Sequence, residues 1–266
     1  MLALFAAAVL LAQDPVNGTV TFESSLELET VIHDGKGETI RQLMLNRKEK
    51  FKQTKVDAKS VKIECLSSSL QKSGSDTPIE EKPTPLAGQS YIATRTDAGW
   101  TVTDPDGGGA PAEGQNLGAW NSISALLPSN GEVKAGDKWT VEGKDLLPLI
   151  FPSSIKDATG KIECSCESVE GGKAGIVFTG QITGKSKDDL QADLKLEIKS
   201  ARLTYDLGKK APSSLLLSGS FESTMDVVDV LRKPGTGGKV NNEEERRKVG
   251  EIAIKSKKME MSLTFE

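Results

Sequence analysis

One histidine, three cysteines and 38 acidic residues are the side chains of this 266-residue chain whose types could perform catalysis or bind a metal. His33 stands beside an Asp34-Gly35 turn signal, which predicts an exposed position at a hairpin tip. A single imidazole excludes a metal site built on two histidines, and the sequence has no Gly-x-Ser-x-Gly nucleophile turn. We assign no catalytic residue. A hydrolase that uses a carboxylate pair stays open as a third hypothesis, because sequence spacing does not locate such a pair.

The three cysteines allow a soft metal site, a disulfide or buried free thiols. Cys164 and Cys166 are two residues apart and therefore lie on the same face of a predicted strand. Cys65 stands at a similar place in an earlier strand. Three thiolates could converge on a soft cation. In an exported protein, pairing of Cys65 with Cys164 or Cys166 is the leading interpretation if the two strands are neighbours, and free thiols come second. We predict no metal site and no cofactor.

Predicted β-strands, in which apolar and polar residues alternate, occupy most of the chain. The first strand places its apolar residues on even positions, from Val20 to Ile32, and two return strands complete an antiparallel meander. The alternation changes phase near Ser200 and again between Ile254 and Met259, which predicts a β-bulge at each place. Two segments are predicted to be exposed loops, namely residues 71–88 and the charged run at 243–248.

Residues 117–151 form the one long segment whose apolar residues do not alternate. From Leu117 to Leu127 they recur at spacings of three and four and stop at Pro128, which predicts a short amphipathic helix. A turn and a strand follow, and a second short helical candidate ends at Phe151. We interpret this segment as a hub that covers one end of the β-structure.

These patterns predict a mainly β fold with long, antiparallel and strongly twisted strands. Curling into an open half-barrel or a wide barrel buries the apolar stripes against each other and under one or two short hub helices. The predicted organisation is an N-terminal β arm over residues 13–116, the hub over 117–151 and a C-terminal β arm over 152–266. We expect the two arms to form one continuous domain.

An apolar run at residues 1–12 predicts the cellular compartment. The run is shorter than the roughly 20 residues that span a bilayer and suits the core of a signal peptide. We predict cleavage after Ala12, so that the mature chain begins near Gln13, has no transmembrane anchor and is exported to the periplasm or the extracellular space. A buried N-terminal strand or helix is the alternative.

The charge balance disfavours two classes of partner. With 34 basic and 38 acidic residues the formal net charge is −4, and no basic stripe is interleaved with aromatic residues. Nucleic acids and anionic membranes both require concentrated positive charge on their partner. We therefore predict no nucleic-acid partner.

The segment Val133-Lys134-Ala135-Gly136-Asp137-Lys138-Trp139, preceded by Leu127-Pro128, resembles a segment of uncharacterised exported bacterial proteins. In those proteins a Leu-Pro or Phe-Pro step precedes a Val-Lys-x-Gly-Asp-x-Trp turn. The resemblance implies an exported β-rich protein and names no activity. Physically, Gly136 and Asp137 favour a turn, and Trp139 anchors the following strand in the core or, alternatively, stacks on a ligand.

Two hypotheses about function come before the hydrolase. The first is a non-catalytic binding or structural protein of the cell envelope, with another envelope protein as its partner. The second is a carrier that shields a lipid-like apolar ligand in the concave face of the sheet, with Trp120, Trp139 and Phe151 as candidate ligand-binding residues. A carrier needs an empty apolar space of at least about 300 Å³, whereas a structural protein fills that space with side chains.

Overall fold

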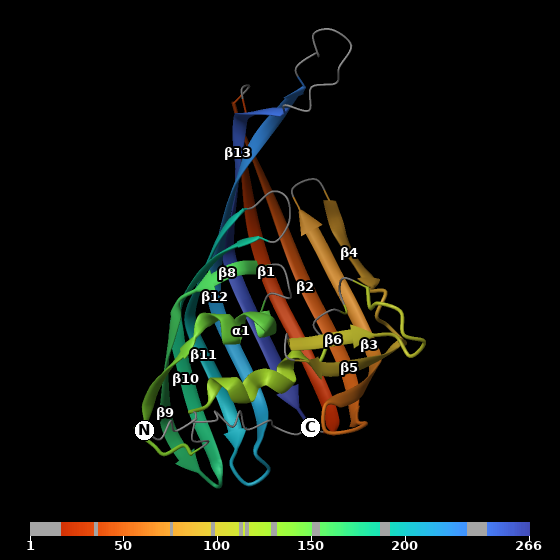
Figure 1. Ribbon diagram of the computed structural model, residues 1–266, viewed down its shortest axis with the longest axis vertical. Coiled ribbons are helices and arrows are strands. Elements are labelled where there is room, and N and C mark those ends of the chain that lie inside the picture. Colours follow the sequence, from red (N-terminus) through yellow and green to blue (C-terminus); the bar gives the residue numbers. More distant parts are fainter. Residues whose placement is uncertain are drawn as a thin grey trace, which may run out of the picture.

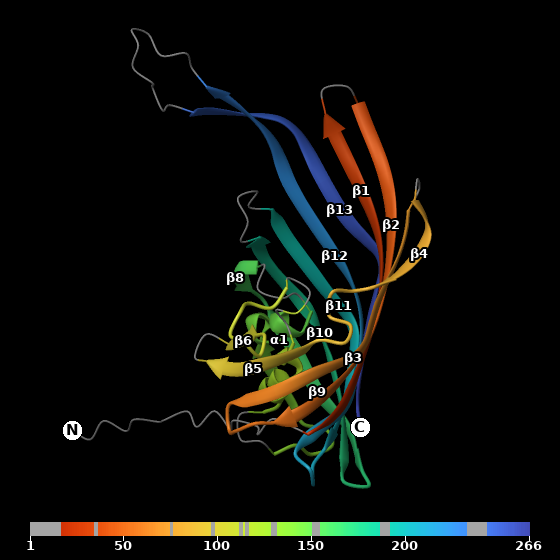
Figure 2. The same ribbon diagram turned by 90° about the vertical axis from the view of Figure 1, so that its right-hand side faces the viewer.

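The described residues of the protein form one antiparallel sheet of 13 strands, shown in Figures 1 and 2. The computed structural model describes residues 17–34, 37–74, 77–96, 99–111, 114, 117–128, 132–150, 155–186, 192–232 and 244–266. In chain order the strands are β1 (Gly18–Asp34), β2 (Gly37–Lys55), β3 (Ser60–Gly74), β4 (Thr77–Pro83), β5 (Ser90–Thr96), β6 (Gly99–Thr103), β7 (Lys138–Glu142), β8 (Ile155–Thr159), β9 (Lys161–Glu170), β10 (Lys173–Ser186), β11 (Asp193–Asp206), β12 (Ala211–Arg232) and β13 (Glu244–Phe265).

The order of the strands confirms the predicted fold class. Hydrogen-bonded neighbours run β6-β5-β3-β2-β1-β13-β12-β11-β10-β9-β7, with β4 added to β3 and β8 added to β10. Pairing of β1 with β13 joins the strands before the hub to those after it. The sheet is strongly curved and stays open, with β6 and β7 at its two ends (Figure 2).

Each long strand is buried on one face only. In β3 and β11, buried residues alternate with half-buried or exposed ones, as a side-chain period of two requires. Buried residues of neighbouring strands stand opposite each other, as Leu203 does to Leu215 and Leu215 to Leu263. These side chains belong to one core cluster, so the concave side of the sheet is the buried side.

Both predicted bulges are confirmed. The pairing of β11 with β12 shifts between Ile198 and Ser200, and the pairing of β13 with β1 shifts between Lys258 and Ser256. After an extra residue in one strand, the side chains of a given face stand at odd instead of even residue numbers, or the reverse. Apolar residues of β11 therefore remain in the core although they change from even to odd positions.

Two short helices of the hub lie across the lower half of the concave face in Figure 1. They are the 3₁₀ helix η2 (Ala119–Leu126) and the α-helix α1 (Gly143–Ile150). Both contribute to the core cluster, η2 through Ile123 and α1 through Leu146. The strand predicted between them is β7, which pairs with β9. In the described part of the chain, no helix is long and apolar enough to cross a membrane.

Trp120 and Trp139 attach the hub to the rest of the molecule in different ways. The Trp120 ring lies 5.3 Å from that of Phe51, and its indole N–H donates a 2.8 Å hydrogen bond to Gln53 Oε1 on β2. Trp120 is 7% exposed. Trp139 is only partly buried against the core, and its N–H donates to the carbonyl of Leu126 at 2.9 Å.

Both loop predictions are wrong. Residues 71–88 contain the end of β3 and the whole of β4, whose two prolines are tolerated because β4 is an edge strand paired with β3 alone. The charged run at 243–248 lies mostly within β13, where Lys248 stands opposite Val228 of β12. Lys248 forms ion pairs with Asp226 and Glu251, so opposite charges on paired strands replace the expected exposed loop.

We predict that Trp120→Ala lowers the free energy of unfolding by about 3 to 5 kcal/mol, because it removes a large side chain from between the hub and the sheet. Trp120→Phe keeps a smaller aromatic ring and loses the hydrogen bond to Gln53, so it costs about 1 to 3 kcal/mol. Urea unfolding of the full chain measures both values. A loss below about 1 kcal/mol for Trp120→Ala would mean that the hub is not packed as the structure has it.

Candidate functional site

The concave face continues above the hub as an uncovered apolar surface. Along β1, Leu28 stands opposite Leu43 of β2 and Ser256 of β13, and Ile32 stands opposite Ile252. Residues directly opposite each other in adjacent strands point to the same face. The same register extends to β12, where Met225 stands opposite Ile252.

We call this surface the apolar floor. It comprises nine side chains from four adjacent strands, each half-buried or exposed: Leu26, Leu28, Ile32, Leu43, Leu45, Met225, Val227, Ile252 and Ile254. Below it, the same strands are sealed by the hub, and Val20, Leu215 and Leu263 are at most 2% exposed. In Figure 1 no described helix lies over the upper half of these strands. The floor is therefore apolar surface that the hub does not cover.

The opposite, convex face of the same strands carries ion pairs as well as the exposed apolar side chains Ile40 and Met44. Lys257 lies 2.6 Å from Glu29, Lys258 lies 3.0 Å from Glu260, and Lys48 lies 3.9 Å from Glu23. The hydrogen bond from Lys257 lowers the pKa of Glu29 below its ordinary value. Such exposed pairs contribute little to stability, but they keep this face hydrated. Along these strands the ion pairs therefore lie on the convex face, whereas most of the apolar side chains lie on the concave face.

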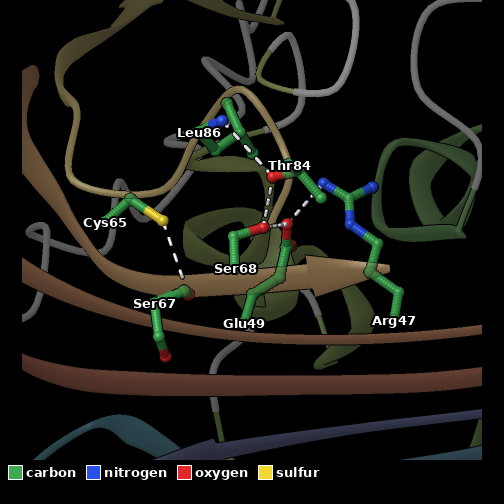
Figure 3. Close-up of polar contacts among 7 residues, drawn as sticks. All are labelled: Arg47, Glu49, Cys65, Ser67, Ser68, Thr84 and Leu86. Carbon is green, nitrogen blue, oxygen red and sulfur yellow. Dashed lines mark hydrogen bonds and ion pairs between the residues drawn. The ribbon is translucent and has the colours of Figure 1, made fainter. Parts of the chain in front are cut away.

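A polar cluster marks the boundary between the floor and the covered core (Figure 3). Arg47 on β2 forms an ion pair of 2.7 Å with Glu49, whose side chain is 4% exposed. Ser68 donates a 2.7 Å hydrogen bond to Glu49 Oε1 and lies 2.5 Å from the Thr84 hydroxyl. The guanidinium of Arg47 lies 5.8 Å from the centre of the Phe22 ring. Glu49 is thus a buried carboxylate whose charge is matched by Arg47 and hydrogen-bonded by Ser68.

Of the three candidate ligand-binding residues, neither Trp120 nor Trp139 belongs to this floor. Trp120 packs within the hub core, and its 7% exposure leaves little surface for a ligand. Trp139 packs beside η2 at the opposite end of the sheet order from β2. Phe151 lies outside the described residues. The exposed apolar surface is instead made of aliphatic side chains.

The condition for a disulfide is not met. Cys65 is on β3 and the other two cysteines are on β9, and six strands separate β3 from β9 in the sheet. All three are buried free thiols. Burial raises the pKa of Cys164 to about 12, and burial together with the charge of Glu49 raises that of Cys65 to about 11. Neutral thiols of this kind are poor nucleophiles and poor metal ligands.

His33 lies where the sequence predicts, at the end of the β1–β2 hairpin. Its side chain is 49% exposed, and Nδ1 lies 3.6 Å from Glu38. Asp104 accepts hydrogen bonds from the backbone N–H groups of Asp106 and Gly108, so this carboxylate stabilises a turn. Within the described residues, no group of three or more potential metal ligands is gathered.

A surface groove of about 420 Å³ lies on the convex side of β10, β11 and β12. Its lining includes Lys185, Asp193, Lys195 and Glu222, and Lys185 lies 3.8 Å from Asp193. This mixed charged lining does not match an apolar ligand. The groove is therefore unrelated to the apolar floor.

Part of the polar cluster can be recognised from the alternation of residues along β2. Leu43, Leu45, Arg47, Glu49 and Phe51 all have odd numbers, so a period of two puts both charges on the apolar face. Their hydrogen-bond partners Ser68 and Thr84 follow from the pairing of β3 with β2 and from the turn after β4. No local pattern in the sequence gives those partners.

No family model and no curated protein matches this sequence. Among solved structures, the chain is similar to lipovitellin, in a structure described as showing lipid–protein interactions in lipovitellin. The similarity has a TM-score of 0.44 and a sequence identity of 8%. It covers 94% of this chain and 25% of the other, so this chain spans about a quarter of lipovitellin's length.

We predict that buried Cys164 makes the protein less stable at alkaline pH. Folding raises the pKa of this thiol from 9.0 to about 12. The contribution of the neutral, buried thiol to the free energy of unfolding is therefore complete below pH 9 and is lost as the pH rises from 9 to 12. Comparing urea unfolding of the wild type and of Cys164→Ala from pH 8 to pH 11 isolates this contribution. A pH-independent difference between the two proteins would contradict the prediction.

The control for this experiment is the number of thiols. A chain unfolded without reductant should show three titratable thiols, since the structure holds all three cysteines as free thiols. A value of one would mean that a disulfide forms.

Proposed function

We propose that this protein is a non-catalytic binding protein that holds a lipid-like apolar ligand on the apolar floor. The observation behind the proposal is the floor itself, in which nine half-buried or exposed apolar side chains share one face of four adjacent strands, while ion pairs lie on the other face. Contiguous exposed apolar surface of this kind is typical of binding sites, because leaving it in water is unfavourable.

The dimensions of the floor suit an acyl chain. From Leu26 to Ile32 the floor extends over six residue steps of β1, roughly 20 Å at about 3.3 Å per residue. Half of a bilayer core, which one acyl chain spans, is about 15 Å thick. A chain lying along β1 would have Leu45 and Leu43 of β2 beside its first half and Ile254 and Ile252 of β13 beside its second half. Thr30, which stands opposite Arg41 of β2, interrupts the apolar row on β1.

The two parts of the concave face differ in how far side chains cover them. Below the Arg47–Glu49 pair, side chains of the hub and sheet fill the concave face, as in a structural protein. Above that pair, the side chains of the floor are half-buried or exposed, so the proposed ligand would be shielded on the side of the sheet. A purely structural role in the envelope is the alternative, and it requires no saturable ligand binding.

We expect a neutral apolar dye to bind saturably and Leu28→Gln to weaken its binding about tenfold, because a polar amide then stands at the centre of the floor. Val31→Gln is the matched control, since Val31 is a half-buried apolar residue on the convex face of the same strand. Fluorescence titration measures both affinities. Equal losses in the two variants, or no saturable binding by the wild type, would contradict the proposal.

We further propose that the protein is exported from a bacterial cell and acts in the periplasm or outside the cell. The apolar run at residues 1–12 and the resemblance at residues 133–139 support this location. When the complete sequence is expressed in an exporting bacterial host, terminal sequencing of the exported fraction should find a start near Gln13. An intact Met1 in that fraction would contradict the cleavage.

A further inference from the structure

The apolar floor has a cationic border at its lower end on β2 and β3. Arg47 follows Leu45 on the concave side of β2, and Lys72 of β3 stands directly opposite Leu45. Arg47 and Lys72 are therefore diagonal neighbours on one face, a separation that long side chains bridge. An amphiphile lying on the floor would have its polar end within reach of both cations.

The neighbouring residues hold Arg47 in place from below. Glu49 accepts the 2.7 Å ion pair, and Ser68 binds the same carboxylate oxygen. The aromatic face of Phe22 lies beside the guanidinium. The Arg47 side chain still keeps 27% of its surface exposed. A guanidinium whose position its neighbours already fix loses little conformational freedom when it binds an anion.

The charges at this border sum to +1. Arg47 is balanced by Glu49, and Lys82 by Glu80, which lies 2.7 Å from the Lys82 ammonium. Glu80 stands opposite Lys72, but its carboxylate forms an ion pair with Lys82. Lys72 is exposed, and no acid within the described residues forms an ion pair with it. The excess of one positive charge matches a monoanion such as a carboxylate.

We propose that the ligand is an acyl-chain lipid with a single carboxylate head, and that Arg47 and Lys72 bind this carboxylate while the chain lies on the floor. The inference rests on the proposed function and adds the chemical class of the head group. Arginine donates a planar pair of N–H groups that fits a carboxylate, and such charge-assisted bonds are stronger next to apolar surface than in water. The lysine supplies the unbalanced charge.

The test compares two ligands that differ only in the head group. Dodecanoic acid and dodecanol are each used at pH 8 to displace the neutral dye from the full chain. We expect the acid to bind about tenfold more tightly than the alcohol, as one charge-assisted contact allows. Dodecyl phosphate is the third ligand, and tighter binding of this dianion than of the acid would overturn the choice of a monoanion.

The variants separate the head-group contact from the floor. Lys72→Gln is exposed and should reduce the preference for the acid several-fold while leaving dodecanol affinity unchanged. Added to Lys72→Gln, the double variant Arg47→Gln/Glu49→Gln removes the second cation without leaving a buried carboxylate unpaired, and should abolish the remaining preference. Lys48→Gln, on the convex face of β2, is the matched control and should change neither affinity.

Each failure has a distinct meaning. If neither dodecanoic acid nor dodecanol displaces the dye, the proposed function fails. If both displace it equally well, or if Lys72→Gln leaves the preference intact, only the head-group inference is overturned. Should the double variant not fold, the decrease of the wild-type acid preference with added salt replaces it, and a salt-independent preference would also overturn the inference.

Discussion

The length of the strands compared with the size of the hub is the constraint on which the rest of this structure depends. β12 and β13 each contain 22 residues, roughly 70 Å of extended chain at about 3.3 Å per residue. The hub helices contain eight residues each, which gives about 12 Å for α1 and about 16 Å for η2. Helices this short cover only part of strands this long, although the strands stay apolar on the same face beyond them. The uncovered remainder is the apolar floor.

The Arg47–Glu49 pair lies at the boundary that this mismatch creates. A charged pair deep in a core costs more desolvation energy than its mutual attraction returns, unless hydrogen bonds satisfy the carboxylate. Glu49 has that support from Ser68, and the Arg47 side chain keeps 27% of its surface exposed to solvent. Moved two residues further into the core, to the position of Phe51, the same pair would lose this solvent contact. The pair therefore fits only where the covered core ends, and it gives the floor a polar end.

Sequence patterns predicted the fold because a side-chain period of two records which face of a strand is buried, and even the bulges of β11 and β13 left a change of phase. They failed where stability comes from a partner strand rather than from the segment itself. β4 contains two prolines and looks like a loop until its pairing with β3 is known, and the charged start of β13 is stabilised by pairs such as Lys248 with Asp226. The candidate site was missed for a related reason. Alternation shows that Leu28 and Ile252 belong to an apolar face, but the point where the hub stops covering that face depends on how far two short helices reach in space.

An uncovered apolar face is normally a liability, because it attracts other exposed apolar surfaces and promotes aggregation. Here the curvature of the sheet limits that risk. A flat or bulky surface, such as a second sheet, contacts the rims of a concave face before it reaches the floor, whereas a narrow flexible chain reaches every side chain on it. The charged pairs on the convex side, such as Lys257 with Glu29, keep water on the other face of the same strands. The shape and the charge pattern therefore act together: convex ion pairs oppose association through the outer face, and concavity restricts the inner face to slender apolar ligands. A sheet with the same residues but without the curvature would expose the floor to any apolar partner, so the twist that long strands impose is itself a determinant of ligand choice.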